Sequence, residues 1–354
     1  MKGRHRVVLV LVLGLACGPA LALESPSESE RLRRELAACP FRILCESYRD
    51  GNWELMVMNA DGSSMENVSQ TPEVDELYPH ASPDGTKAVF LQDEGEGEQR
   101  RRDVYMMNID GSGRVRVAEN GRQPFWSPDG KTIAYAMGRD ARYPKDPYAN
   151  QGLCFYDVAT HKVTAHPRDD ISGLLNPCFS PDGRWVIASA VRGMGFNKSI
   201  IAFQAHGAGV AELIRSRAGP DDLYQCRPDV SPDGRRVAWG TGNTRHGDYM
   251  WVEVAEVDFT VSEPKIGARE KVVQVDFPVQ TYHVDWSPGG KYIAYSQGTI
   301  GGRMQQAQPV IGNKAKGWDL WVVNAAQPKV CARITHDGLS YKEPDWVFVN
   351  GDEG

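Results

Sequence analysis

The sequence has 354 residues, of which 41% are hydrophobic and 24% are charged, and its formal net charge is −6. An acidic chain of this kind lacks the basic surface that a nucleic-acid-binding protein needs, so nucleic acid is excluded as a partner. After the N-terminus no stretch approaches the roughly 20 consecutive apolar residues of a membrane-spanning helix, so no transmembrane segment is predicted.

The N-terminus has the three parts of a secretory signal peptide. Residues 2–6 carry three basic side chains, residues 7–15 form an apolar core, and residues 20–22 are a small-residue cleavage site. We therefore expect the mature protein in the periplasm or outside the cell. Cys17 leaves an alternative open, because residues 15–18 are similar to a bacterial lipoprotein cleavage site and would place a lipid anchor on this cysteine.

One short phrase, an apolar residue followed by Ser-Pro-Asp-Gly, recurs about every 45 to 60 residues. Its copies begin at Ala81, Trp126, Phe179, Val230 and Trp286, the last with Gly in place of Asp. Residues 344–349 begin a sixth, incomplete copy. A repeat of this length in an all-β sequence is typical of a propeller, because one four-stranded sheet cannot bury both faces and must stack against its neighbours around a ring.

Each phrase is predicted to be the tip of a β-hairpin. Proline fixes φ at the second position of a tight turn, aspartate suits the third, and glycine supplies the positive φ that leads into the next strand. The strand before the phrase is then the innermost of its blade, and the strand after it is the second. A third strand follows in every blade, at Glu54–Asn59, Asp103–Asn108, Leu153–Asp157, Ser199–Phe203, Tyr249–Val254 and Asp319–Asn324.

The first blade begins with a second strand at Phe41–Cys45 and has no innermost strand of its own. We expect Glu343–Val349 to supply it, which closes the ring and covers an edge that could otherwise pair with other chains. The predicted fold class is all-β, a six-bladed β-propeller of four-stranded antiparallel blades. A closed ring also predicts a monomer. The predicted division of the chain is a signal peptide at residues 1–22, a lead segment at 23–40, the propeller at 41–349 and a tail at 350–354.

The phrase at Trp126–Lys131 and the following Ile133–Tyr135 resemble the repeat of TolB-like, WD40-like propellers. The resemblance covers residues 41–349 and implies the fold. It does not imply one function, since propellers of this kind serve as binding scaffolds, as accessory domains of peptidases and as lyases. TolB itself carries an N-terminal α/β domain, whereas only residues 23–40 precede the first blade of this chain, which argues against a direct role in the Tol–Pal envelope system.

A ring of polar residues is predicted where the innermost strands line the central channel. In each blade it occupies the position four residues before the turn serine, or the matching position in the sixth copy. The members are Tyr78, Gln123, Asn176, Arg227, His283 and Glu343. Polar side chains that converge on one opening are typical of a ligand site. The alternative is that they line a channel filled with water.

Basic residues gather in the loops that are predicted to surround one mouth of this channel. Two of these loops, at residues 138–152 and 298–317, are long, and long loops at the rim of a scaffold often carry function. The polar and basic residues concerned are Arg139, Arg142, Lys145, Tyr148, Arg192, Lys198, Arg245, His246, Arg303, Gln305, Gln306, Lys314 and Lys316. Such a mouth would attract an anionic ligand.

Two classes of function follow. The favoured hypothesis is a non-catalytic scaffold that binds an envelope or secreted protein, or an anionic ligand such as a glycan, at the loop-rich mouth. No general catalytic motif occurs in the sequence. The alternative is a metal-assisted lyase or hydrolase of anionic oligosaccharides, in which His283 transfers a proton, Glu343 assists it and Arg227 neutralises the substrate.

The sequence predicts no cofactor. The enzyme alternative would need a divalent metal held by His80 and His283 with Glu343 or Gln123 as a third ligand.

Six cysteines follow the predicted signal peptide, at Cys39, Cys45, Cys154, Cys178, Cys226 and Cys331. They lack the spacing of a zinc site and are too far apart for a dense disulfide scaffold. Most are expected to be buried thiols. A bridge between Cys39 and Cys45, or from either to Cys331, is the alternative.

Overall fold

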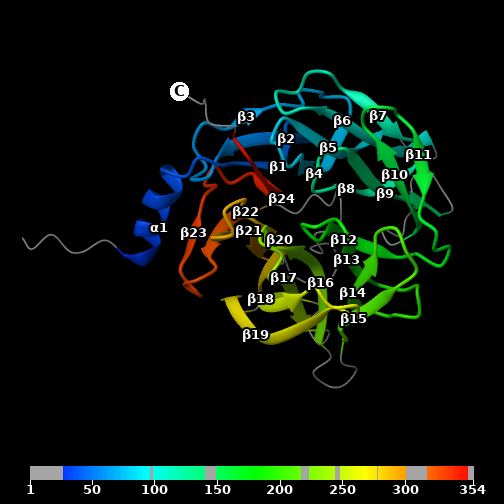
Figure 1. Cartoon of the computed structure of the whole chain (residues 1–354). Coiled ribbons are helices and arrows are strands. Elements are labelled where there is room, and N and C mark those ends of the chain that lie inside the picture. Colours follow the sequence, from blue (N-terminus) through cyan, green and yellow to red (C-terminus); the bar gives the residue numbers. More distant parts are fainter. Residues whose placement is uncertain are drawn as a thin grey trace, which may run out of the picture.

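The computed structural model describes residues 27–95, 99–139, 149–216, 223–243, 248–276, 278–299 and 317–349. Six antiparallel sheets of four strands each are arranged in a ring (Figure 1). This arrangement confirms the predicted six-bladed propeller. The predicted signal peptide, Cys17 and the tail at residues 350–354 lie outside the described residues.

The strands of blades one to three follow one another from the central channel to the periphery of the ring. Blade one contains β24 (Ser340–Val347), β1 (Arg42–Arg49), β2 (Asn52–Asn59) and β3 (Glu66–Asn67). Blade two contains β4 (Asp75–Ala81), β5 (Lys87–Glu94), β6 (Arg101–Asn108) and β7 (Val115–Ala118). Blade three contains β8 (Gly121–Trp126), β9 (Thr132–Gly138), β10 (Asn150–Asp157) and β11 (Val163–Ala165).

The other three blades have the same order of strands. Blade four contains β12 (Leu174–Phe179), β13 (Trp185–Ala190), β14 (Ser199–Gln204) and β15 (Val210–Ile214). Blade five contains β16 (Leu223–Val230), β17 (Arg236–Asn243), β18 (Asp248–Asp258) and β19 (Lys265–Gln274). Blade six contains β20 (Val279–Trp286), β21 (Tyr292–Thr299), β22 (Trp318–Asn324) and β23 (Cys331–Arg333).

The Ser-Pro-Asp-Gly phrases are the tight turns between first and second strands, as predicted. In blade three, the hydroxyl of Ser127 donates to the carboxylate of Asp129 at 2.6 Å, and the amide of Gly130 donates to the carbonyl of Ser127 at 2.9 Å. Gly130 has a φ of +67°, in the left-handed region that favours glycine. We call the side of the propeller that carries these turns the turn face.

The innermost strands share a β-bulge that the sequence analysis did not anticipate. The six predicted channel residues all have left-handed φ angles, between 42° for Asn176 and 58° for Arg227. The pairing register with the second strand shifts at the same place in every blade. Proline follows the bulged residue in five blades, at Pro79, Pro124, Pro177, Pro228 and Pro344. Proline cannot donate to a ladder, so bulges and sheet edges are where a strand accommodates it.

The core is divided among six apolar clusters that lie between blades. The residue before each turn serine falls in a different cluster, as the sequence analysis expected of a position that packs blades together. These residues are Ala81, Trp126, Phe179, Val230, Trp286 and Trp346.

The ring closes where β24 pairs with β1, with Ile43 opposite Trp346. This confirms that the C-terminal strand completes blade one.

The lead segment contains a helix, α1 (Glu28–Ala37), which packs against the outside of this closure. Leu32 and Leu36 are buried in the same apolar cluster as Trp346. The carboxylate of Glu35 accepts from Lys291 Nζ at 2.7 Å and from the hydroxyl of Tyr292 at 3.0 Å. The helix therefore links the lead segment to blade six.

All six cysteines of the described part carry free thiols, and Cys45 and Cys226 are buried. Among the described residues, no helix is both long and apolar enough to cross a membrane.

Candidate functional site

The structure brings the six predicted site residues together in one buried layer, which we call the bulge layer. It consists of Tyr78, Gln123, Asn176, Arg227, His283 and Glu343, all less than 9% exposed. The innermost strands place them there, because each lies at the bulge of its own blade.

The middle of the bulge layer is a network around His283. Its Nδ1 lies 2.5 Å from a carboxylate oxygen of Glu343 and 2.8 Å from the side-chain amide nitrogen of Asn176. Arg227 donates to the side-chain amide oxygen of Asn176 at 2.7 Å, and its guanidinium lies 3.8 Å from the centre of the Tyr282 ring. These contacts join blades four, five and six with the closing strand of blade one.

The bulged backbone is held by side chains as well. The backbone N–H of Asn176 donates to the side-chain oxygen of Gln123 at 2.7 Å. The backbone N–H of Tyr78 donates to Glu46 at 2.8 Å, and that of Arg227 donates to Ser189 at 2.7 Å. Because these buried N–H groups have side-chain partners, the left-handed backbone is retained without an unsatisfied donor.

Charges are matched within the bulge layer and beside it. Burial would raise the pKa of Glu343, but His283, Arg227 and Lys342 outweigh it and lower that pKa to about 2. Lys342 itself is fully buried, 3.4 Å from Glu46 and 4.2 Å from the Trp53 ring. Burial lowers the pKa of Lys342 and raises that of Glu46 to about 6. A substitution that removes one partner would leave the other charge buried.

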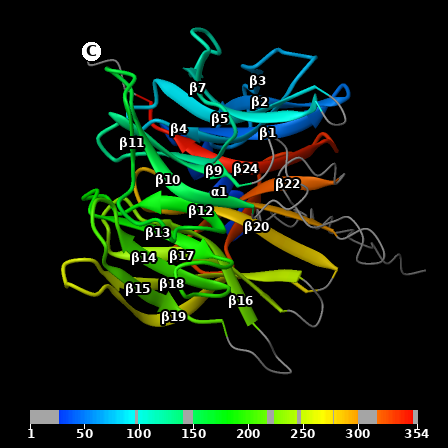
Figure 2. The same cartoon turned by 90° about the vertical axis from the view of Figure 1, so that its right-hand side faces the viewer.

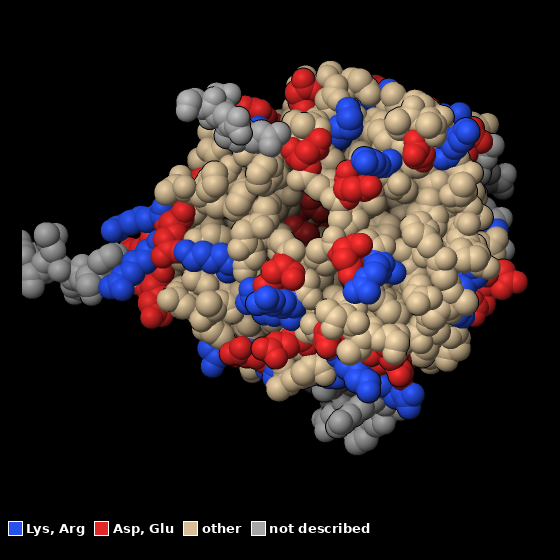
Figure 3. All heavy atoms as spheres, in the orientation of Figure 1, with Lys and Arg blue, Asp and Glu red and all other residues tan. Residues whose placement is uncertain are grey.

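A second polar layer lies two residues further along the innermost strands, toward the turn face. It contains His80, Asp229, Asp285 and Asp345, and we call it the aspartate layer. These residues border a hollow of about 550 Å³ at the centre of the turn face. Figure 3 shows this hollow from outside, with acidic atoms at its bottom.

The sequence analysis missed the aspartate layer as a site, although a signal for it exists. Three copies of the repeat have aspartate two residues before the turn serine or its equivalent, where the other copies have His80, Phe125 and Cys178. In a strand this position shares a face with the predicted ring, so the same periodicity could have found it.

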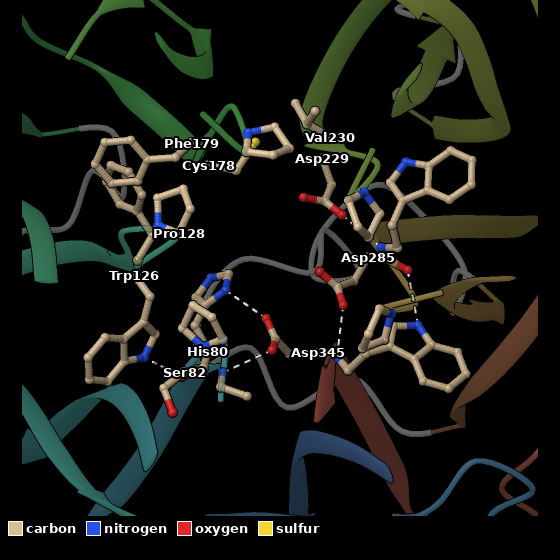
Figure 4. A pocket seen from close by; sticks show the side chains of 18 of the residues that line it. His80, Ser82, Trp126, Pro128, Cys178, Phe179, Asp229, Val230, Asp285 and Asp345 are labelled. Atoms are coloured by element: carbon tan, nitrogen blue, oxygen red, sulfur yellow. Dashed lines mark hydrogen bonds and ion pairs between the residues drawn. The ribbon is translucent and has the colours of Figure 1, made fainter. Parts of the chain in front are cut away.

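Each aspartate of the layer also connects its blade to the next one. Asp229 accepts from the backbone N–H of Trp286 at 2.7 Å, and Asp285 accepts from that of Trp346 at 2.8 Å. Asp345 accepts from the N–H of Ala81 at 2.9 Å. One oxygen of each carboxylate is therefore structural. Figure 4 shows the three carboxylates gathered at one side of the hollow.

Crowding changes the acidity of these groups. Burial, together with the charge of Asp345, raises the pKa of Asp229 to about 6. Burial and both neighbouring carboxylates raise the pKa of Asp285 well above its ordinary range. Burial disfavours a charged His80, but Asp345, 2.8 Å from its Nδ1, outweighs burial and raises the pKa of the imidazole. The layer thus combines the His80–Asp345 pair with the carboxyl groups of Asp229 and Asp285, which both lose a proton less readily than an exposed aspartate.

The opposite side of the hollow is apolar. Phe125 and Phe179 pack with their ring centres 5.0 Å apart, and Trp126 lies beside them (Figure 4). Prolines of the turns complete the rim, at Pro83, Pro128, Pro181, Pro232 and Pro288. The hollow therefore presents carboxylates and aromatic surface to the same occupant.

The two layers are in contact through three rings. The Tyr78 ring lies 5.0 Å from the His80 ring and 6.2 Å from that of His283, and the two histidines are 6.2 Å apart between ring centres. His80 and His283, which the enzyme alternative would place on one metal, are thus neighbours in the structure. In the ranges that the structure describes, no group of three or more His, Cys, Asp or Glu side chains is arranged to hold a metal ion.

Of the residues predicted at the loop-rich mouth, three lie in the described part. Arg139, Arg192 and Lys198 lie between the second and third strands of their blades, at the opposite end of the second strand from the turn face. The others lie outside the described residues: Arg142, Lys145, Tyr148, Arg245, His246, Arg303, Gln305, Gln306, Lys314 and Lys316.

No family model matches the chain. A stretch of 104 residues is 35% identical to an uncharacterized protein of Agrobacterium fabrum and covers 26% of this chain and 35% of that protein. The chain thus spans about a third of the length of this curated relative.

Solved structures show the fold. TolB from Acinetobacter baumannii is similar over 87% of this chain and 66% of its own, with a TM-score of 0.61 and 19% identity. A chain of a nidogen/laminin complex is similar over 87% of this chain and 98% of its own, with a TM-score of 0.55 and 10% identity. The predicted resemblance to TolB-like propellers is confirmed for the fold.

Proposed function

We propose that this chain is an exported propeller that binds a segment of a protein partner in the hollow of the turn face. The observation that carries the proposal is the hollow itself, of about 550 Å³, which is lined by both carboxylates and aromatic rings. This volume is within the usual range of binding pockets, which are mostly apolar with a few polar groups that fix orientation. Export is part of the proposal and rests on residues 1–22.

The chemistry of the hollow favours a segment with a basic side chain next to an apolar one. The carboxylates of Asp229 and Asp285, which line the hollow, can accept charge-assisted hydrogen bonds from a lysine or arginine. Phe125 and Phe179 provide a surface for an aliphatic or aromatic side chain. Proline-rich and aromatic rims are rigid, which lowers the entropy lost on binding.

The acidity of the aspartate layer is a second argument for binding. Holding several carboxylates together costs stability, as the raised pKa values of Asp229 and Asp285 indicate. Strongly shifted groups beside a cavity are typical of functional sites. A cationic group in the hollow would lower this cost, so the free protein favours such an occupant.

The bulge layer has a supporting role in this proposal, because its side chains are buried and bonded to one another behind the hollow. An anionic ligand or glycan at the opposite, loop-rich mouth stays a prediction, since most of the residues named for it lie outside the described part. Lipid anchoring at Cys17 stays a prediction for the same reason.

A peptide selection tests the proposal. The mature chain, residues 23–354, is immobilised and used to select from a phage-displayed library of random peptides at low salt. Selected peptides are then measured in solution against the wild type, Asp229→Asn and Glu263→Gln. The last variant removes one exposed negative charge away from the hollow and is the control.

We expect selected peptides to carry lysine or arginine beside an apolar residue. Asp229→Asn should weaken them about tenfold, or about 1.4 kcal/mol, while Glu263→Gln should bind as the wild type does. Enriched peptides without basic residues, or equal affinity for Asp229→Asn and the wild type, would show that the hollow is not the site.

A further inference from the structure

The outermost strand of blade five is much longer than the outermost strands of the other blades. β19 has 10 residues, whereas β3, β7, β11, β15 and β23 have 2, 4, 3, 5 and 3. Its partner β18 is also long, with 11 residues. Figures 1 and 2 show β19 at the periphery of the ring. Ring closure by β24 covers the inner edge of blade one, but it leaves β19 as the outer edge of blade five.

The first part of β19 makes few contacts with the rest of the protein. Residues 267–271 are exposed throughout, as is Lys265, and Ile266 is half-buried. In the described part of the chain, residues 265–271 have no backbone hydrogen bond outside the ladder with β18. The next residue of the strand, Val272, does have a partner: its carbonyl accepts from the backbone N–H of Lys329 at 2.9 Å. About 20 Å of strand edge therefore precedes this contact, with a shift of the pairing register between Ile266 and Arg269.

This open edge is basic, although the chain as a whole has a net charge of −6. Lys265, Arg269 and Lys271 carry positive charge, and Glu270 is the single acidic residue of the strand. Two of the cations rest on aromatic rings: Arg269 lies 5.8 Å from the centre of the Trp239 ring and Lys271 lies 3.9 Å from that of Trp251. Such contacts order the two side chains before any partner arrives.

We propose that residues 265–271 of β19 pair with an extended, acidic segment of a protein partner, which adds a fifth strand to blade five. Backbone groups of the edge would supply the hydrogen bonds, and the cations would select carboxylates on the added strand. Charged side chains on an edge can also serve to prevent pairing. In the other blades the outermost strand is short, which leaves little edge for another chain to pair with. Protection against unwanted pairing therefore does not require an outermost strand as long as β19. The surface is separate from the hollow of the turn face.

The probe for this proposal is a labelled eight-residue peptide of alternating valine and glutamate, with both ends blocked. Its binding to residues 23–354 is followed by fluorescence polarisation. A lysine version of the peptide is the charge control. Two further versions carry N-methyl groups on alternate residues, on the odd positions in one and on the even positions in the other, so that each blocks one edge of the added strand.

The protein variants are matched in charge. Arg269→Glu combined with Lys271→Glu reverses the charge of the edge, and Arg33→Glu combined with Arg34→Glu makes the same change on the exposed face of α1. We expect the first pair to weaken the glutamate peptide about tenfold or more and the second to change it less than about twofold. One N-methylated version should lose binding, and the lysine peptide should not bind.

The proposal is overturned if the glutamate peptide does not bind, if both double variants behave alike, or if neither N-methylated version is affected. Light scattering adds one more outcome: a wild-type dimer that Arg269→Glu with Lys271→Glu dissociates would assign the edge to a second copy of this chain and contradict an acidic partner. Asp229→Asn should bind the peptide as the wild type does, so failure at the edge is distinct from failure of the hollow.

Discussion

Replacing Asp229 by asparagine removes one carboxylate from the aspartate layer and keeps an oxygen that can accept from the N–H of Trp286. The substitution therefore tests the charge rather than the hydrogen bond. In the wild type, burial and Asp345 raise the pKa of Asp229 from 3.8 to about 6. A difference of about 2 units at about 1.4 kcal/mol each makes the ionised Asp229 cost about 3 kcal/mol in the folded state.

The sign follows from linkage. When folding raises the pKa of an acid, the contribution of that acid to the stability of the protein is fully present below its unfolded-state pKa. That contribution is lost as pH rises through the folded-state pKa. For Asp229 the loss occurs between about pH 4 and pH 6 and is complete at pH 8. We therefore expect Asp229→Asn to be more stable than the wild type at pH 8, by up to about 3 kcal/mol, and to differ little at pH 4.

The measurement is urea unfolding followed by tryptophan fluorescence at several values between pH 4 and pH 8, with Glu263→Gln as the control. The control should follow the wild-type profile, because Glu263 is exposed. If the unfolding free energies of the wild type and Asp229→Asn change with pH in the same way, the reasoning is refuted, because the ionised Asp229 would then not destabilise the folded protein. A gain in stability at pH 8 combined with weaker peptide binding would show that the site is maintained at the expense of the fold.

Two other predictions concern the ring closure. Lys342→Met leaves Glu46 buried without its cation and should destabilise the protein by about 3 to 5 kcal/mol in urea unfolding. Adding Glu46→Gln should restore part of this stability. An equal loss of stability in the double variant would contradict the pairing of Lys342 with Glu46. Leu36→Ala should weaken the packing of α1 against the propeller by about 2 to 5 kcal/mol, and hydrogen exchange of residues 28–37 should become faster. The control, Arg31→Ala on the exposed side of the helix, should leave hydrogen exchange unchanged.

The sequence was sufficient for most of the fold because its information is local and repeated. Pro, Asp and Gly define the turns through their own backbone preferences, so five turns and one incomplete copy of the repeat predict six blades. The pairing of β24 with β1 could also be predicted from the sequence. Phe41–Cys45 had no strand before it to pair with on its inner side, and the last copy of the repeat had no second strand after it. The helix at Glu28–Ala37 was not predicted, although Ser27 and Glu30 form a capping box at its start.

The candidate site was only partly predictable. Periodicity placed Arg227, His283 and Glu343 in one layer, but it could not show that they are buried at a bulge, or that Asn176 links Arg227 to the His283–Glu343 pair. The longest loops lie at the opposite mouth, so loop length as a signal points away from the aspartate layer. Burial raises the pKa of Asp229 and Asp285, and carboxylates more than 50 positions away in the chain raise it further, and neither effect can be read from a single sequence.

The pairing of β24 with β1 also determines the order in which the molecule can be completed. A chain made from its N-terminus presents β1 (Arg42–Arg49) long before Ser340–Val347 exists. Until that last strand arrives, blade one has an open inner edge, the hollow lacks Asp345, and Glu46 has no Lys342 beside it. The hollow is therefore complete only after β24 has paired with β1, so the proposed binding of a partner there requires the closed ring.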